Sequence, residues 1–151
     1  IEFPNKPTEI TKLVRTEYGQ LPIHIISYDA SNDNSPNLSY IVSYVDYPDT
    51  VIDSYASDNF SEIFKSTTQN AINTLHGKLD HVTIDSIKNY PGEEIKISFQ
   101  DGKTVFREKN FIVKNRLYSI MVITDAKKDF NKSIDNYFNS FKLQWQTYYR
   151  H

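Results

Sequence analysis

The sequence of 151 residues contains no cysteine and only four glycines. The lack of cysteine excludes disulfide bonds, thiolate nucleophiles and metal sites built from thiolates. The glycines are too scattered to form a phosphate-binding loop, and no G-x-S-x-G segment places a serine nucleophile on a sharp turn. We therefore expect no enzyme and no cofactor, with a hydrolase assembled from dispersed residues as a remote alternative.

The sequence also lacks long apolar runs and any excess of positive charge. Seventeen Lys and Arg face nineteen Asp and Glu, so nucleic acid is not an expected partner. No segment reaches the roughly 20 apolar residues that cross a bilayer. The chain begins at Ile1 without Met, which suggests that an export signal, a lipoprotein leader or cloning-derived residues were removed. We expect an extracytoplasmic location, periplasmic or cell-surface, and a lipid anchor upstream of residue 1 stays open.

Aromatic residues, in contrast, are abundant, with eleven Tyr and nine Phe. Such large rings fill much of a core, while tyrosine hydroxyls stay near water. A chain of this length buries enough surface for one core, so we expect a single domain over residues 1–151.

Alternation of apolar and polar residues predicts two antiparallel meanders. The Asp101-Gly102 pair is the strongest hairpin signal, because both central positions of such a turn need positive φ. Further turns are expected at Gly19-Gln20, Tyr90-Pro91-Gly92 and Lys114-Asn115. The expected strands cover residues 9–18, 21–29 and 38–47 in the first meander, and 81–89, 93–100, 103–113 and 116–124 in the second.

Helical spacing of apolar residues predicts two main helices. The first runs from Phe60 to Leu75, with Ser57 or Asp58 as its cap and Gly77 at its end. The second follows Asp129 as its cap, and a short helical turn is expected around residues 49–55. The apolar positions of this second main helix are Phe130, Ile134, Tyr137, Phe138 and Phe141. The fold class is thus α+β, an antiparallel sheet of about six or seven strands packed with two main helices.

Three consecutive charged residues, Arg107, Glu108 and Lys109, interrupt the strand over residues 103–113. Pairing across Asp101-Gly102 places Lys96 opposite Arg107 and Glu94 near Lys109. These side chains could form a cross-strand ion network, bind an anionic ligand or an acidic protein surface, or be solvated charges of a sheet face. The candidate binding residues are Lys96, Arg107, Glu108, Lys109, Arg116 and Tyr118.

Two further segments offer alternatives. Asp29, Ser31 and Asp33 place oxygen atoms at alternate positions, as in the first half of a calcium loop, but Asn34 replaces the turn glycine and Tyr40 the closing Glu. An ordinary hairpin loop is therefore expected, with calcium as the weaker alternative and no other metal. The aromatic tail over residues 145–151 either caps the core or acts as an interaction arm.

Several segments together resemble the PsbP-like superfamily, which includes photosystem accessory proteins, a Ran-binding nuclear-import factor and exported or lipid-anchored bacterial proteins. They are Phe3-Pro4-x-Lys6-Pro7, Tyr90-Pro91-Gly92-Glu93-Glu94-Ile95, the strand pair from Arg107 to Val122, and Phe138-x-x-Phe141. The resemblance covers most of the chain. It implies an α/β/α sandwich used for accessory or docking roles, and it supplies no catalytic residues.

The leading functional hypothesis is a non-catalytic extracytoplasmic binding or accessory domain, which docks on an envelope protein through its exposed sheet face and adjoining loops. The alternative is a carrier of a small molecule or anion. In that case a cleft between the sheet and the helix from Phe60 to Leu75 holds the ligand, and Arg107 or Arg116 fixes the anion.

Overall fold

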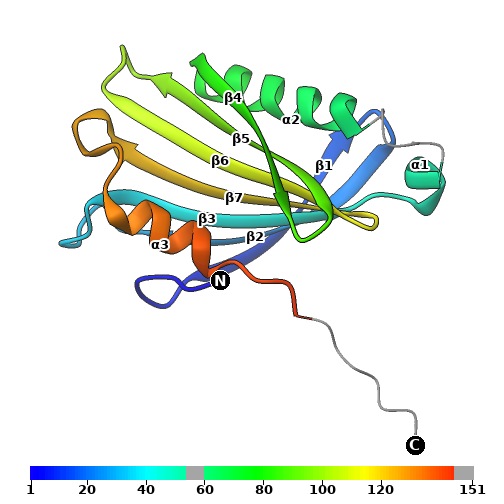
Figure 1. Ribbon diagram of the computed structural model, residues 1–151, viewed down its shortest axis with the longest axis horizontal. Coiled ribbons are helices and arrows are strands. Elements are labelled where there is room, and N and C mark those ends of the chain that lie inside the picture. Colours follow the sequence, from blue (N-terminus) through cyan, green and yellow to red (C-terminus); the bar gives the residue numbers. More distant parts are fainter. Residues whose placement is uncertain (54–59, 145–151) are drawn as a thin grey trace, which may run out of the picture.

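Seven antiparallel strands form one sheet in the computed structural model, which describes residues 1–53 and 60–144 (Figure 1). The strands are β1 (Thr8–Thr16), β2 (Gly19–Asp29), β3 (Asn37–Asp46), β4 (Lys78–Ile87), β5 (Tyr90–Phe99), β6 (Thr104–Val113) and β7 (Arg116–Asp125). The helical segments are α1 (Asp49–Asp53), α2 (Phe60–Leu75), the 3-10 turn η2 (Ala126–Lys128) and α3 (Lys132–Ser140). The predicted α+β class is confirmed.

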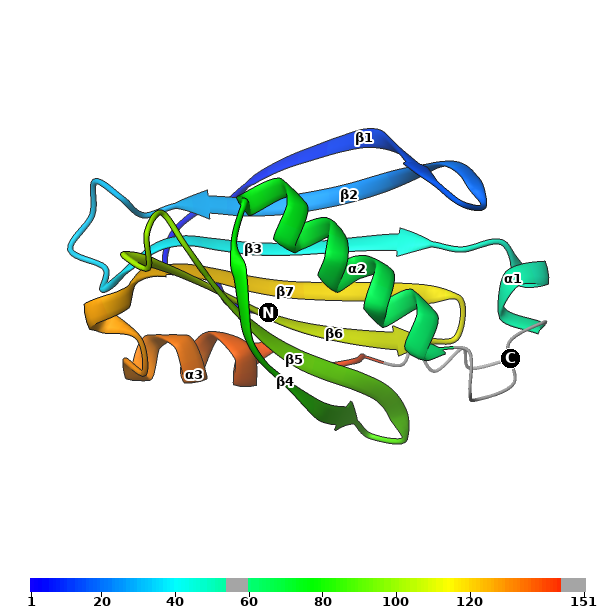
Figure 2. The ribbon, with the colours of Figure 1, turned by 90° about the horizontal axis from the view of Figure 1, so that it is seen from above.

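The two predicted meanders join side by side in the order β1-β2-β3-β7-β6-β5-β4 (Figure 2). The joint is an antiparallel pairing of β3 with β7, in which Ser43 lies opposite Ser119. This pairing leaves β1 and β4 as the edge strands and puts β6 and β7 in the interior of the sheet.

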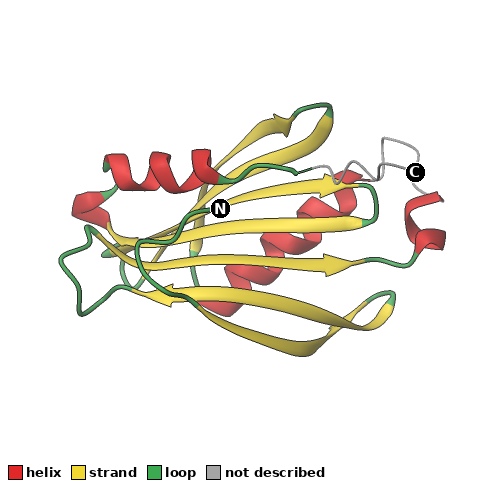
Figure 3. Cartoon of the chain, turned by 90° about the horizontal axis from the view of Figure 1, so that it is seen from below, coloured by secondary structure: helices red, strands yellow, loops and turns green. Residues whose placement is uncertain are grey.

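Helices α2 and α3 lie on opposite faces of the sheet (Figures 1 and 3). Side chains alternate between faces along a strand, so each face has its own core. On the α2 face, Phe64 packs in a cluster with Ile112, and Ile72 packs against a second cluster around Ile97. On the α3 face, Ile134 and Phe138 pack in a third cluster over β3, β6 and β7.

The hairpin at Asp101-Gly102 has the predicted geometry. Asp101 and Gly102 both have positive φ, 56° and 78°, and the Lys103 N–H donates to the Gln100 carbonyl at 3.1 Å. The predicted pairs across this turn are confirmed, including Lys96 opposite Arg107. The turn at Lys114-Asn115 likewise sets Phe111 opposite Tyr118.

Two other predicted turns were wrong. The chain reverses at Glu17-Tyr18 instead of Gly19-Gln20, and at Lys88-Asn89 instead of Tyr90-Pro91-Gly92. Gly92 is a strand residue, where a Cβ atom would lie 2.6 Å from the backbone oxygen of Asn110 and closer still to a neighbouring ring. This glycine is therefore explained by close packing between strands, which the sequence does not distinguish from a turn.

The start of the second helix also differs from the prediction. Asn131 caps α3 by accepting a hydrogen bond from the Ile134 N–H at 3.3 Å, and Asp129 belongs to the preceding turn. Phe130, expected in the core, is 77% exposed. The predicted caps Ser57 and Asp58 and the tail over residues 145–151 lie outside the described residues. None of the helices described is long and apolar enough to cross a membrane.

Candidate ligand-binding groove and the charged residues of the sheet

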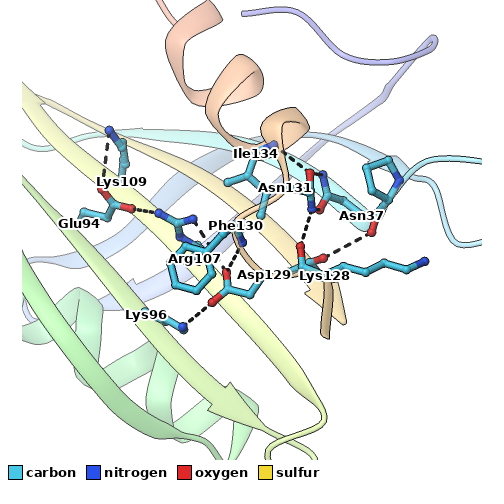
Figure 4. Close-up of polar contacts among 12 residues, drawn as sticks. Asn37, Glu94, Lys96, Arg107, Lys109, Lys128, Asp129, Phe130, Asn131 and Ile134 are labelled. Carbon is cyan, nitrogen blue, oxygen red and sulfur yellow. Dashed lines mark hydrogen bonds and ion pairs between the residues drawn. The ribbon is translucent and has the colours of Figure 1, made fainter. Parts of the chain in front are cut away.

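Four of the predicted site residues lie on β5 and β6, but they divide between the two faces of the sheet. Lys96, Arg107 and Lys109 point to the α3 face (Figure 4). There Lys109 and Arg107 lie over the ring of Phe138, at 5.4 and 5.8 Å from its centroid. Glu108 points to the α2 face, because neighbouring residues of a strand alternate in direction.

Carboxylates neutralise the three cations of the α3 face. Arg107 Nη2 donates to Glu94 Oε1 at 2.5 Å, and Lys109 Nζ lies 3.7 Å from Glu94 Oε2 (Figure 4). Lys96 pairs with Asp129, which Arg107 also approaches at 3.9 Å. A last carboxylate, Asp85 of β4, lies 3.2 Å from Lys109 Nζ.

This charged network therefore has three positive and three negative side chains, all less than one third exposed. Of the three interpretations considered for these charges, the structure shows the cross-strand ion network. Because the charges compensate one another, little positive potential is left to attract an anion or an acidic surface.

Glu108 is not a solvated charge of the sheet face, which was one interpretation of the sequence. Its side chain is buried, with 3% of its surface exposed, between the two apolar clusters of the α2 face. Burial raises its pKa to about 7, and the charge of Glu93 adds to the rise, while the nearby polar groups of Asn110 and Ser119 limit it. Glu108 thus exchanges a proton near neutral pH.

Arg116 and Tyr118 form a separate, half-exposed surface on the α3 face. Arg116 makes two hydrogen bonds to Asp46, at 2.7 and 2.9 Å, and its guanidinium lies 4.3 Å above the ring of Tyr44. On the other side of Tyr44, His24 of β2 stacks on the Tyr44 ring, with ring centroids 4.5 Å apart. These side chains form a ladder of rings and one cation across β2, β3 and β7.

A groove of about 990 Å³ runs along the opposite face, between α2 and the edge of the sheet at β4 and β5. Its walls are mainly apolar, and two of its β4 side chains, Val82 and Ile84, are largely exposed. The apolar lining residues are Phe60, Phe64, Ile72, Leu79, Val82, Ile84 and Pro91.

The cleft of the carrier hypothesis is thus present, but its charge was predicted wrongly. Arg107 and Arg116 lie on the other face of the sheet and do not line it. The groove carries instead the carboxyl group of Glu93, which accepts a hydrogen bond from Thr68 of α2 at 3.0 Å. Burial raises the pKa of Glu93, and the Thr68 hydrogen bond partly opposes this rise.

A row of polar side chains extends from Glu93 into the core beneath α2. In neighbouring strands, Glu93 lies opposite Asn110, Asn110 opposite Ser119, and Ser119 opposite Ser43. Ser119 Oγ donates to Asn110 Oδ1 at 2.6 Å. This polar row, defined by these four residues, separates the two apolar clusters of the α2 face.

Sequence reasoning missed the polar row and Glu93 as site residues. Glu93 and Glu94 lie on opposite faces of β5, with Glu93 bonded to Thr68 of α2 and Glu94 to Arg107. The available signal was the alternation itself, since Glu93, Glu108 and Asn110 share the strand face of Ile95, Phe106 and Ile112. Polar groups at such positions are buried with them.

The loop considered for calcium uses its oxygen atoms locally. The Asp29 carboxylate accepts hydrogen bonds from the Ser31 N–H at 3.0 Å and the Ser31 hydroxyl at 2.6 Å, and the Tyr28 hydroxyl donates to Asp33. Within residues 1–53 and 60–144, no group of three or more His, Cys, Asp or Glu side chains could hold a metal ion. The hairpin-loop interpretation accounts for these contacts.

No protein-family model matches the sequence, and no curated protein is similar to it. Among solved structures, the fold is similar to the crystal structure of PA94 from Pseudomonas aeruginosa, described as a protein of unknown function and a putative regulator. The TM-score is 0.55, and the sequences are 12% identical over 89% of this chain and 97% of that chain. At this identity the likeness shows a common fold, and function must be argued from the site.

Proposed function

We propose that this protein is a non-catalytic binding domain that holds an apolar small molecule in the groove between α2 and strands β4 and β5. The observation that carries the proposal is the groove itself. Its volume of about 990 Å³ and its mainly apolar surface, with polar groups such as Glu93 and Thr68 beside it, are typical of small-molecule sites. Exposure of Val82 and Ile84 on the same wall favours a ligand that covers them.

The charged network on the other face does not compete as a ligand site. Its six charges compensate one another, and all six side chains are less than one third exposed. We therefore assign Lys96, Arg107 and Lys109 a role in stability. An extracytoplasmic location and the PsbP-like relationship stay predictions from the sequence.

Titration with 1-decanol, a neutral apolar probe, tests the proposed site. We expect the amide resonances of α2, β4 and β5 to shift in ¹H–¹⁵N NMR spectra. Val82→Lys places a charge in the groove at a half-exposed position, and it should weaken binding about tenfold or more. Leu13→Lys on the opposite edge strand, where Leu13 is also exposed, is the matched control and should bind like wild type.

Unshifted groove resonances would contradict the proposal. Equal binding by the Val82→Lys and Leu13→Lys variants would contradict it too, because only Val82 lines the groove.

A second candidate function, docking on an envelope protein, is favoured by the ladder of His24, Tyr44, Arg116 and Tyr118. Aromatic side chains and Arg are the residue types that anchor protein interfaces, and these are half-exposed in the structure. A partner that docks here should be captured from an envelope fraction by wild type and lost with Tyr118→Ser. Equal capture by both proteins would exclude this surface.

A further inference from the structure

The charge of the groove is one-sided. Among the described residues that line it, Glu17, Glu62 and Glu93 are acidic, and Lys65 carries the only positive charge. Lys65 already pairs with Glu62 at 3.7 Å. An anionic ligand would therefore meet net negative charge, and a cationic ligand would meet unpaired carboxylates.

Glu93 stands where the groove meets the core. It lies opposite Ile84 on one side and Asn110 on the other, so its carboxyl group is at the boundary between the apolar wall and the polar row. One oxygen of this group accepts from Thr68 at 3.0 Å, and a carboxylate has room for further hydrogen bonds. Glu108 lies diagonal to Glu93 on the same face, two residues from Asn110 along β6.

Asn110, opposite Glu93, continues the polar side of this boundary into the core. Its side chain is fully buried on the same face as Glu93, and its amide helps to limit the rise in the pKa of the neighbouring Glu108. Its amide oxygen, Oδ1, is used by Ser119. Glu93 is therefore the point at which the buried polar row reaches the lining of the groove.

We propose that the groove selects ligands that carry a positive charge on an apolar body, with Glu93 as the counter-ion of that charge. This inference rests on the proposed function and names its ligand class, a cationic amphiphile such as a protonated long-chain amine. The apolar body lies against Phe64, Ile72 and Val82. The charged head donates to the carboxylate of Glu93.

Three probes of equal chain length test the choice of charge: decylammonium, 1-decanol and decanoate, each below its micelle concentration at pH 7. The ammonium group is protonated at this pH. In isothermal titration calorimetry we expect decylammonium to bind about tenfold or more tightly than decanoate, with 1-decanol between them. The preference should shrink when salt is raised from 0.05 to 0.5 M.

Glu93→Gln keeps the shape of the side chain and an oxygen that can accept from Thr68. We expect it to remove the preference for decylammonium while 1-decanol binds as before. Glu9→Gln, an exposed position on the other face of β1, changes the net charge equally and should keep the preference.

The outcomes separate the two proposals. If decanoate binds as tightly as decylammonium, or if the preference survives both Glu93→Gln and high salt, the selection of cations is wrong and the groove remains a binding site. If none of the three probes binds, the proposed function fails, and this inference fails with it.

Discussion

Lys96 and Arg107 lie directly opposite each other on β5 and β6, and both reach the carboxylate of Asp129. Like charges in directly opposed positions destabilise a sheet. Here the turn before α3 brings Asp129 between them, with only 4% of its side chain exposed (Figure 4). A buried carboxylate thus joins the helix of one face to the strands beneath it.

Removing this carboxylate should therefore be costly. We expect Asp129→Asn to lower the free energy of unfolding by roughly 3 kcal/mol, because it leaves the half-buried Lys96 without its counter-ion, opposite an Arg107 that keeps only Glu94. Urea unfolding followed by circular dichroism measures the change. Asp135→Asn, at an exposed position on α3, is the control and should change stability by less than about 0.5 kcal/mol. Similar values for the two variants would contradict a structural role of the network.

Glu108 should make the protein less stable as the pH rises. Its pKa is about 7 in the folded protein and 4.5 in the reference state, so the folded state holds a proton that the unfolded state releases between these values. Stability falls through that window by roughly 3 kcal/mol and levels off above it. Glu108→Gln should flatten the profile and be the more stable protein at pH 8.

Urea unfolding at pH 5, 6, 7 and 8 gives this profile. Glu93 contributes a slope of the same sign, because burial also raises its pKa. The double variant with Glu93→Gln should therefore remove the rest of the slope. A wild-type stability that rises from pH 5 to pH 8 would show that the carboxyl of Glu108 is not desolvated.

Gly92 should tolerate alanine worse than Gly102 does. A Cβ atom at Gly92 meets the backbone oxygen of Asn110 at 2.6 Å, where neither strand can move away without breaking its pairing. We expect Gly92→Ala to cost about 2 kcal/mol or more. Gly102→Ala has open space and suffers only the strain of its positive φ of 78°, about 1 kcal/mol. The reverse order of melting temperatures would contradict the close approach of β5 and β6.

Asn131 should contribute through both ends of its amide. Oδ1 caps α3, and Nδ2 donates to Asn37 Oδ1 at 2.7 Å. Asn131→Ala loses the cap and leaves buried Asn37 without this donor, for an expected cost of about 2 kcal/mol. Asn131→Asp keeps the capping oxygen and loses the donor, so its free energy of unfolding should lie between the other two. An Asp variant as unstable as the Ala variant would show that the cap contributes nothing.

Local sequence pattern was sufficient to predict the elements and the pairing across the turns at Asp101-Gly102 and Lys114-Asn115. The period-2 alternation and the Asp101-Gly102 turn depend on neighbours in the chain, and they set Lys96 opposite Arg107. Predictions based on one residue type were weaker. Gly92 was assigned to a turn because the sequence does not show whether a glycine is needed for positive φ or for close packing between strands.

By itself, then, the sequence determined the α+β class, the seven strands, the helix from Phe60 to Leu75 and the charges that face one another across β5 and β6. Only the tertiary structure decided what those charges do. Asp129 reaches them from a turn more than twenty residues away, and pairing of β3 with β7 builds the polar row from residues far apart in the chain. The negative charge of the groove was also decided by tertiary structure. Glu93 lines a groove only because α2 packs on the same face of the sheet.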